Sequence, residues 1–283
     1  MPTAVESVVV EVSDLESAVR DYARLLGHEP LRVSCRPDGA DAAEPVEQIA
    51  RFFLRNTSLE LRARVAETSD PAGPGAVAGM RLSCGAEEPA RLVTERGLSI
   101  GVSEPWASLD DEGEILARWQ RVPIDARMSR SLPVELRLGE PMAGETLCTP
   151  AFDPAGCVEA LDHVVVLSAA PDATRAFYEE ALGIRLALDR SFEARGVRLL
   201  FFRLGGVTIE IGSRLGASAE PAAADGFGGL AWRVTDVSAI HARLAGEGFD
   251  VSEIRDGHKP GTRVCTVRTP VHGVPTLLIQ PAA

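Results

Sequence analysis

His163 has the setting most suited to chemistry, because it lies in a short run of β-branched residues, ALDHVVVLS. Alternation along a strand puts Val165 and Leu167 on the same face as His163. Glu210 lies in a second strand-like run, VTIEIG. A carboxylate beside an imidazole favours its charged form and can orient it as a general acid or base. Whether the two meet depends on the elements that carry them.

Alternating and helical patterns predict the elements of two similar halves. In the first half we expect helices over 14–26 and 87–97, and strands over 5–12, 28–34, about 50–56, 58–65, 79–84, 98–104, 115–122 and 131–138. In the second half we expect helices over 171–182 and 237–248, and strands over 160–168, 184–190, 196–204, 206–212, 229–234, 249–254, 262–268 and 275–280. A tight turn at Asn56-Thr57 joins two of the strands in the first half.

Constant spacings between the halves indicate an internal repeat. Ser7 and His163 are 156 positions apart, as are Gly27 and Gly183. Glu60 and Glu210 are 150 positions apart, as are Gly79 and Gly229. Each half is itself a doublet of strand–helix–strands. The sequence therefore predicts an α+β fold of paired βαβββ modules in two domains, over residues 1–138 and 160–283. A linker rich in Gly and Pro is expected over 139–159.

Composition excludes several classes of protein. The chain has 283 residues, 45% apolar and 25% charged, with a net charge of −12. That charge argues against a nucleic-acid partner, because phosphate binding needs clustered Lys and Arg. The sequence holds no apolar run of about 18 residues, so no membrane span is expected. Its five cysteines are scattered without a CxxC, which argues against a zinc knuckle and favours a reducing, cytoplasmic location.

Five segments carry a family resemblance: LDHVVVL with RAFYEEALGIRL, then GGVTIEI, GLAWRVTDV and GVPTLLIQP. Fainter versions in the first half are VESVVVEVSDLESAVRDYARLLG, NTSLELR, GMRLSC and LPVELRLGEP. With these segments the chain resembles the vicinal oxygen chelate superfamily of glyoxalase I, bleomycin-resistance proteins and extradiol dioxygenases. The resemblance covers nearly the whole chain. It implies two tandem glyoxalase-like domains, each a half-open barrel.

The resemblance also implies a divalent metal held from four strand positions on the concave face. Carried over to the C-terminal domain, those positions are His163, Glu210, Gly229 and Leu277, of which the first two match and the last two depart from the pattern. In the N-terminal domain they are Ser7, Glu60, Gly79 and a carboxylate near Glu135, without a histidine.

Two donors are too few for catalytic zinc or non-haem iron, each of which needs about three protein ligands. A loop residue such as His258 or His272 could complete the set with Zn, Ni, Mn or Fe. We therefore expect that the metal site is incomplete and that no metal is bound. Arg233 alternates onto the Gly229 face, where it could bind a carboxylate or an enolate oxygen. Trp232 is expected to face the helices, and Cys265 to be a buried packing residue rather than a nucleophile.

Two functions remain open on this evidence. The first is recognition of a small organic ligand in the C-terminal cavity, lined by His163, Glu210, Gly229, Arg233 and Leu277. The alternative is a lyase, isomerase or dioxygenase that acts on a vicinal oxygen substrate through His163 and Glu210, with a loop ligand to complete a metal site. A His–Glu pair without any catalytic role also stays open. The N-terminal domain is then a structural or dimerising unit, which leaves a homodimer as an expectation.

Overall fold

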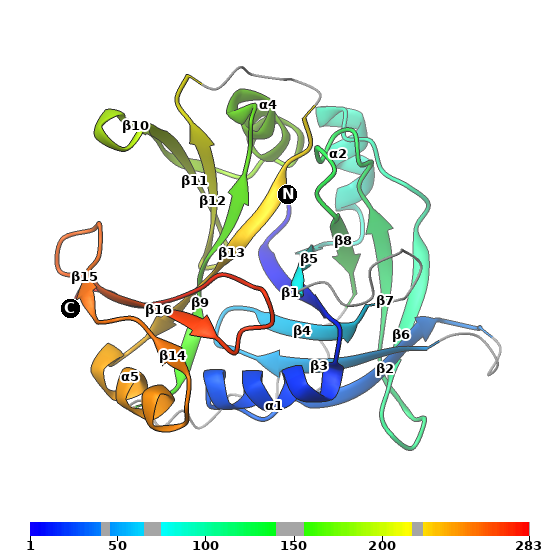
Figure 1. The fold of residues 1–283 in the computed structure, drawn as a ribbon. Helices are drawn as coiled ribbons and strands as arrows, with labels where there is room; N and C mark the ends of the chain where they lie inside the picture. The colour runs from blue at the N-terminus through cyan, green and yellow to red at the C-terminus, as the bar shows by residue number, and fades with distance from the viewer. Residues whose placement is uncertain (41–45, 65–74, 140–155, 217–222, 283) are drawn as a thin grey trace.

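The computed structural model describes residues 1–40, 46–64, 75–139, 156–216 and 223–282 (Figure 1). The strands of the first half are β1 (Ala4–Val12), β2 (Leu31–Pro37), β3 (Glu47–Phe53), β4 (Ser58–Ala63), β5 (Ala76–Cys84), β6 (Glu104–Leu109), β7 (Ile115–Pro123) and β8 (Val134–Leu138). The strands of the second half are β9 (Val158–Leu167), β10 (Leu186–Phe192), β11 (Val197–Leu204), β12 (Val207–Arg214), β13 (Gly226–Val234), β14 (Asp250–Val251), β15 (Arg255–Asp256), β16 (Arg263–Thr269) and β17 (Thr276–Gln280).

The helices are α1 (Leu15–Leu26), α2 (Glu88–Arg96), α4 (Pro171–Arg175), the π-helical turn η1 (Ala176–Ala181), the 3₁₀ turn η2 (Glu193–Arg195) and α5 (Val237–Gly246). Helix α1 begins and ends where its sequence predicts. The Asp14 side chain accepts a hydrogen bond from the backbone N–H of Ser17, and Gly27 ends the helix with φ of 76°. The helix expected over 171–182 starts as α4 and continues as η1.

Both halves have the same strand order, which confirms the paired βαβββ modules. The N-terminal order is β2-β3-β4-β1-β5-β8-β7-β6 and the C-terminal order is β10-β11-β12-β9-β13-β17-β16-β14, with β15 paired to β16. The first and fourth strands of each domain run parallel, as β1 with β4 and β9 with β12.

The two domains differ in closure. In the N-terminal domain β2 pairs with β6 from Ser34↔Leu109 to Pro37↔Trp106, which closes an eight-stranded barrel. This domain is therefore more closed than the half-open barrel that the resemblance implied. In the C-terminal domain β10 and β14 are the two sheet edges, and β14 has only two residues, too few to make such a ladder. The C-terminal sheet keeps one open face.

Two expectations about element bounds need correction. The strand predicted over 98–104 is wrong, because β6 spans Glu104–Leu109 and only Ile100 forms an isolated bridge, to Ile124. Strand β9 starts at Val158, inside the segment 139–159 assigned to a linker. Residues 140–155 of that segment lie outside the described residues.

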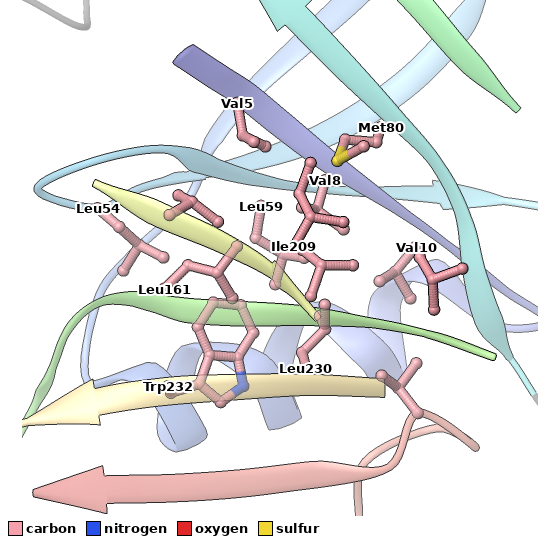
Figure 2. Packing of buried hydrophobic residues seen from close by; sticks show 14 of the residues in the cluster. Val5, Val8, Val10, Leu54, Leu59, Met80, Leu161, Ile209, Leu230 and Trp232 are labelled. Atoms are coloured by element: carbon pink, nitrogen blue, oxygen red, sulfur yellow. The ribbon is translucent and has the colours of Figure 1, made fainter. Parts of the chain in front are cut away.

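One hydrophobic cluster spans both domains. It contains Val8 and Leu59 from the N-terminal sheet together with Val164, Ile209 and Trp232 from the C-terminal sheet, all buried. Figure 2 shows side chains of Val8, Leu59, Ile209 and Trp232 packed within this one cluster. Trp232, which was expected to face the helices, is buried in this core. The same cluster includes side chains of α1, η1 and α5, so one face of each sheet is covered by this core and the opposite face lies toward the barrel interior or the open side.

In the described part of the chain, no helix has the length and apolar character needed to cross a membrane.

Candidate functional site

A β-bulge in β9 brings Asp162 and His163 together. The pairing with β13 passes from Leu161↔Trp232 to His163↔Ala231, so Asp162 is an extra residue in the ladder. At a bulge, alternation is interrupted and a side chain is turned from its regular face. Nδ1 of His163 consequently lies 3.0 Å from Oδ1 of Asp162, although the two residues are consecutive in a strand.

The imidazole of His163 lies between two carboxylates. Asp162 contacts Nδ1, and Oε2 of Glu210 lies 3.7 Å from Nε2 on the other side of the ring. The 3.7 Å separation is longer than a hydrogen bond, whereas the contact to Asp162 has normal hydrogen-bond length. In the neutral ring, an Nδ1–H donor to Asp162 leaves the Nε2 lone pair directed toward Glu210.

Arg233 completes this group by pairing with the other oxygen of Asp162. Its Nη2 lies 3.2 Å from Oδ2, and the Arg233 side chain is 31% exposed. Burial by itself raises the pKa of Asp162, but the hydrogen bond and charge of His163 and the charge of Arg233 outweigh burial and hold the pKa below its ordinary value. Asp162 is therefore a carboxylate at neutral pH. Arg233, which was predicted to bind a ligand, instead forms an ion pair with Asp162.

Glu210 lies one strand away from His163 and one step along the sheet. Strand β12 pairs with β9 through Thr208↔His163 and Glu210↔Val165, so Glu210 approaches the imidazole diagonally. Of the predicted site residues, the structure brings together His163, Glu210 and Arg233. It adds Asp162, whose signal in the sequence was its position directly before His163.

Gly229, the third strand position carried over from the resemblance, lies diagonally across from His163, because β13 pairs with β9 through Gly229↔Val165 and Ala231↔His163. A Cβ atom at Gly229 would lie 2.5 Å from the carbonyl oxygen of Pro275, and φ at Gly229 is 142°. Glycine is required there by the close approach of the backbone. The residue that directly faces His163 is Ala231, which in turn pairs with Leu277. Leu277 pairs with Ala231 as Glu210 pairs with Val165, so Gly229 and Leu277 hold the third and fourth strand positions and offer no donor atom there.

The two loop histidines lie elsewhere. Nε2 of His272 lies 2.9 Å from Oδ2 of Asp21 in α1, and its ring stacks on Tyr22 with 6.1 Å between centroids. His258 is exposed in the turn between β15 and β16. At the four strand positions, His163 and Glu210 can ligate a metal but Gly229 and Leu277 cannot. Within the described residues, no group of three or more His, Cys, Asp or Glu is arranged for a metal ion. The donor set does not fit the metal centre that the resemblance implied.

In the N-terminal barrel a guanidinium occupies the equivalent place. Arg81 pairs with Ser7 across the sheet, as Ala231 pairs with His163, and its neighbour in β8 is Glu135. Its side chain donates to both Glu60 and Glu135. Burial raises the pKa of Glu60, but the charges of Arg81 and Arg51 outweigh burial and lower it. Glu60 and Glu135, the two carboxylates expected at the N-terminal strand positions, thus bind the guanidinium of Arg81.

Further ion pairs lie near Arg81 in this barrel. Glu6 accepts from Arg51 and from Arg137 at 3.0 Å each, and Glu135 accepts from Arg121 at 2.6 Å. The remaining cavity beside Arg81 and Glu60 has about 10 Å³, roughly the space of one water molecule. The other N-terminal position, Gly79, lies against the Pro133 carbonyl, 3.2 Å from a Cβ placed there. The interior of the N-terminal barrel is therefore closely packed around Arg81 and Glu60.

The open face beside His163 is largely apolar. Phe201 is paired with Glu210 on one side and with Leu188 on the other. Leu188 is 46% exposed and Leu167, at the far end of β9, is 55% exposed. Cys265 is buried in β16, and burial raises the pKa of its thiol to about 11, so it packs as expected and stays protonated at neutral pH. The site thus combines one acid–base group with an apolar surface.

Two solved structures show the same fold over nearly the full chain, and a third is similar to about half of it. A mutant of 4-hydroxymandelate synthase from Streptomyces coelicolor is 15% identical, with a TM-score of 0.67, over 100% of this chain and 94% of that one. The catechol dioxygenase BphC, described as halotolerant, is 12% identical, with a TM-score of 0.59, over 99% and 87%. Methylmalonyl-CoA epimerase from Mycobacterium tuberculosis is 24% identical, with a TM-score of 0.40, over 47% and 95%.

A comparison with curated protein sequences finds no match. Residues 162–266 match the sequence profile described as Glyoxalase/Bleomycin resistance protein/Dioxygenase superfamily. This segment begins at Asp162 and contains His163, Glu210, Ala231 and Arg233. The resemblance predicted from the sequence is confirmed: over residues 162–266 the chain is similar to the Glyoxalase/Bleomycin resistance protein/Dioxygenase superfamily.

Proposed function

We propose that the C-terminal domain binds a small organic ligand on the open face of its sheet, with His163 as the central polar contact. The observation that carries the proposal is the imidazole between Asp162 and Glu210, at the edge of an apolar surface. Ligand sites commonly combine a few convergent polar groups with an apolar lining.

Each residue has a distinct part in this proposal. Asp162 fixes the ring through Nδ1, so that Nε2 is the atom presented to the ligand. Glu210 lies close enough to Nε2 to share a ligand hydroxyl or a water with it. Phe201 and Leu188 supply apolar contact area beside these polar atoms. A ligand with a hydroxyl or carbonyl group next to an aromatic or alkyl part fits this arrangement.

A metal has no part in the proposed binding, because Ala231 and Leu277 supply no donor beside His163 and Glu210. The N-terminal barrel is proposed as a structural unit, since Arg81 and its partners fill its interior. A homodimer, a cytoplasmic location and the absence of nucleic-acid partners stay predictions of the sequence.

A second candidate is a metal-free enzyme that transfers a proton. The contact of 3.0 Å between Asp162 and His163 favours it, because a carboxylate on Nδ1 stabilises the imidazolium that forms when Nε2 accepts a proton. A substrate with an acidic C–H beside a carbonyl group fits this chemistry. Glu210 is then placed to accept or return a proton on the same side of the ring.

Binding is tested by ligand-detected NMR with benzoate, phenylpyruvate, catechol and pyruvate as probes. We expect wild-type protein to bind at least one aromatic probe and His163→Ala to bind it at least about tenfold more weakly, since a buried polar contact is worth about 1.5 kcal/mol. His258→Ala removes an exposed histidine and is the matched control. Equal binding by wild type and His163→Ala contradicts the proposal. Transfer of deuterium from D₂O into phenylpyruvate or pyruvate, above the rate with His163→Ala, identifies the enzyme.

A further inference from the structure

Asn56, the only asparagine of the chain, lies in the turn between β3 and β4 and reaches into the C-terminal domain. Its Nδ2 donates to the carbonyl oxygen of Leu161 at 2.8 Å, and its Oδ1 accepts from the backbone N–H of Leu161 at 3.0 Å. The side-chain amide therefore pairs with one residue of β9 as a neighbouring strand does.

The position of Leu161 in β9 explains why the contact with Asn56 stabilises the strand. Strand β12 begins its pairing with β9 at Thr208↔His163, so Leu161 lies beyond the end of that ladder. Leu161 is fully buried, and buried backbone groups without partners cost about 1–3 kcal/mol each. Next to Asn56, the backbone N–H of Arg55 donates to the carbonyl oxygen of Glu159 at 3.1 Å. The β3–β4 turn thus extends the C-terminal sheet along the first part of β9.

The turn itself is held in place from the C-terminal side. Nδ2 of Asn56 also donates to the carbonyl oxygen of Gly206, in the equivalent turn between β11 and β12, at 3.1 Å. The adjacent Gly205 packs so closely on β1 that a Cβ placed on it would lie 2.6 Å from Cα of Ala4. The β3–β4 turn and the β11–β12 turn thus contact each other, and residues of both domains fix the position of Asn56 relative to β9.

We propose that Asn56 is a positioning residue for the site: by fixing Leu161 on one side of β9, it holds the Asp162 bulge and hence the orientation of His163. Leu161 directly precedes the bulge, and its other ladder partner is Trp232 in the shared core. Asp162 reaches Nδ1 of His163 only because the chain is displaced at this point. Through the Asn56 side chain, the N-terminal domain therefore acts on the C-terminal site. The effect of Asn56 on ligand binding by His163 rests on the proposed function.

The test compares wild type with Asn56→Ala, Asn56→Asp and Gln48→Ala. Asn56→Asp keeps the acceptor for the N–H of Leu161 but loses the donor to the two carbonyl oxygens. Gln48→Ala removes an exposed amide that bonds Ser34 within the N-terminal domain and is the matched control. Three quantities are measured by ¹⁵N NMR: the single Asn side-chain amide of wild type, amide exchange of Leu161, and the tautomer of His163.

In Asn56→Ala we expect exchange of the Leu161 amide to accelerate about tenfold or more relative to Val164 and Val166 in the same strand. We also expect the His163 ring to lose its preference for the Nδ1–H tautomer. Asn56→Asp should lie between Asn56→Ala and wild type, and Gln48→Ala should match wild type. An Asn56→Ala protein with the wild-type His163 tautomer overturns the inference. If that variant does not fold, the same tautomer comparison on Asn56→Asp decides.

The tautomer is read without any ligand, so this test is separate from the proposed function. A tautomer change in a protein that binds none of the four probes supports the positioning role and contradicts the binding proposal. Probe binding with an unchanged tautomer in Asn56→Ala contradicts the positioning role alone.

Discussion

Arg81 in the N-terminal barrel and Ala231 in the C-terminal sheet occupy the same position of the internal repeat. Each pairs with the residue at the first-strand position, Ser7 or His163, and each has a neighbour at the fourth position, Glu135 or Leu277. In one domain this position carries a guanidinium that joins two carboxylates; in the other it carries a methyl group. The same position is thereby filled by a long side chain in the N-terminal domain and holds only a small one in the C-terminal domain.

Removing the guanidinium should destabilise the N-terminal barrel. Arg81→Met leaves Glu60, which is 2% exposed, without its closest cation, and we expect a loss of about 3–5 kcal/mol in the free energy of unfolding. The measurement is urea denaturation at pH 7. Glu60→Gln combined with Arg81→Met removes the orphaned charge and should recover part of the loss. Arg32→Ala, at the exposed pair with Glu16, is the control and should cost less than about 1 kcal/mol. If Arg81→Met lowers the free energy of unfolding by no more than Arg32→Ala does, the buried ion-pair network is contradicted.

The register of β13 can be tested by introducing a metal ligand. Ala231→His places a third donor directly opposite His163, so we expect Zn²⁺ to bind with one-to-one stoichiometry in calorimetry. Gly229→His meets the Pro275 carbonyl and should instead destabilise the domain by about 1–3 kcal/mol, without gaining zinc affinity. Combining Ala231→His with His163→Ala should abolish the zinc binding. Zinc binding by Gly229→His but not by Ala231→His shows that the register is wrong.

The Asp162 carboxylate should make stability depend on pH. Its pKa in the folded protein lies below its ordinary value, so its ionised form stabilises the fold above about pH 4, and this stabilisation disappears as the pH falls through the folded-state pKa. We expect Asp162→Asn to be less stable than wild type by about 1.5–3 kcal/mol at pH 7, the usual value of a hydrogen bond to a charged group. The difference should shrink in urea titrations between pH 5 and about pH 2. A difference that stays constant over this range contradicts the assigned pairing with His163 and Arg233.

The shared core predicts that the two domains unfold together. The barrel holds Trp106 and Trp119, and the C-terminal domain holds Trp232. Ile209→Ala removes a C-terminal side chain that lies in the cluster with Val8 and Leu59, and it should cost about 2–5 kcal/mol. Trp106 and Trp119 report on the barrel when Trp232 is replaced by Phe, and Trp232 reports on the C-terminal domain when Trp106 and Trp119 are replaced by Phe. In both backgrounds, fluorescence should show the same decrease in the urea midpoint on Ile209→Ala. An unchanged midpoint for the barrel reporters contradicts a common core.

The sequence by itself determined the local elements and the repeat. Apolar alternation and the caps at Asp14 and Gly27 act over a few residues, so β1, α1, β9 and most other elements lie near their predicted ranges. The 156- and 150-residue spacings identified equivalent strands. On that basis His163 and Glu210 could be expected on one face, since both lie in strongly alternating strands.

Only the tertiary structure decided what surrounds these two residues. A bulge adds one residue to a strand, which alternation cannot reveal, so the contact of Asp162 with His163 was missed. Barrel closure depends on pairing β2 with β6 across about seventy residues of chain. The contacts of Arg81 with Glu60 and of Asn56 with Leu161 likewise join residues that no local pattern connects, because long side chains find their partners only when distant strands have packed.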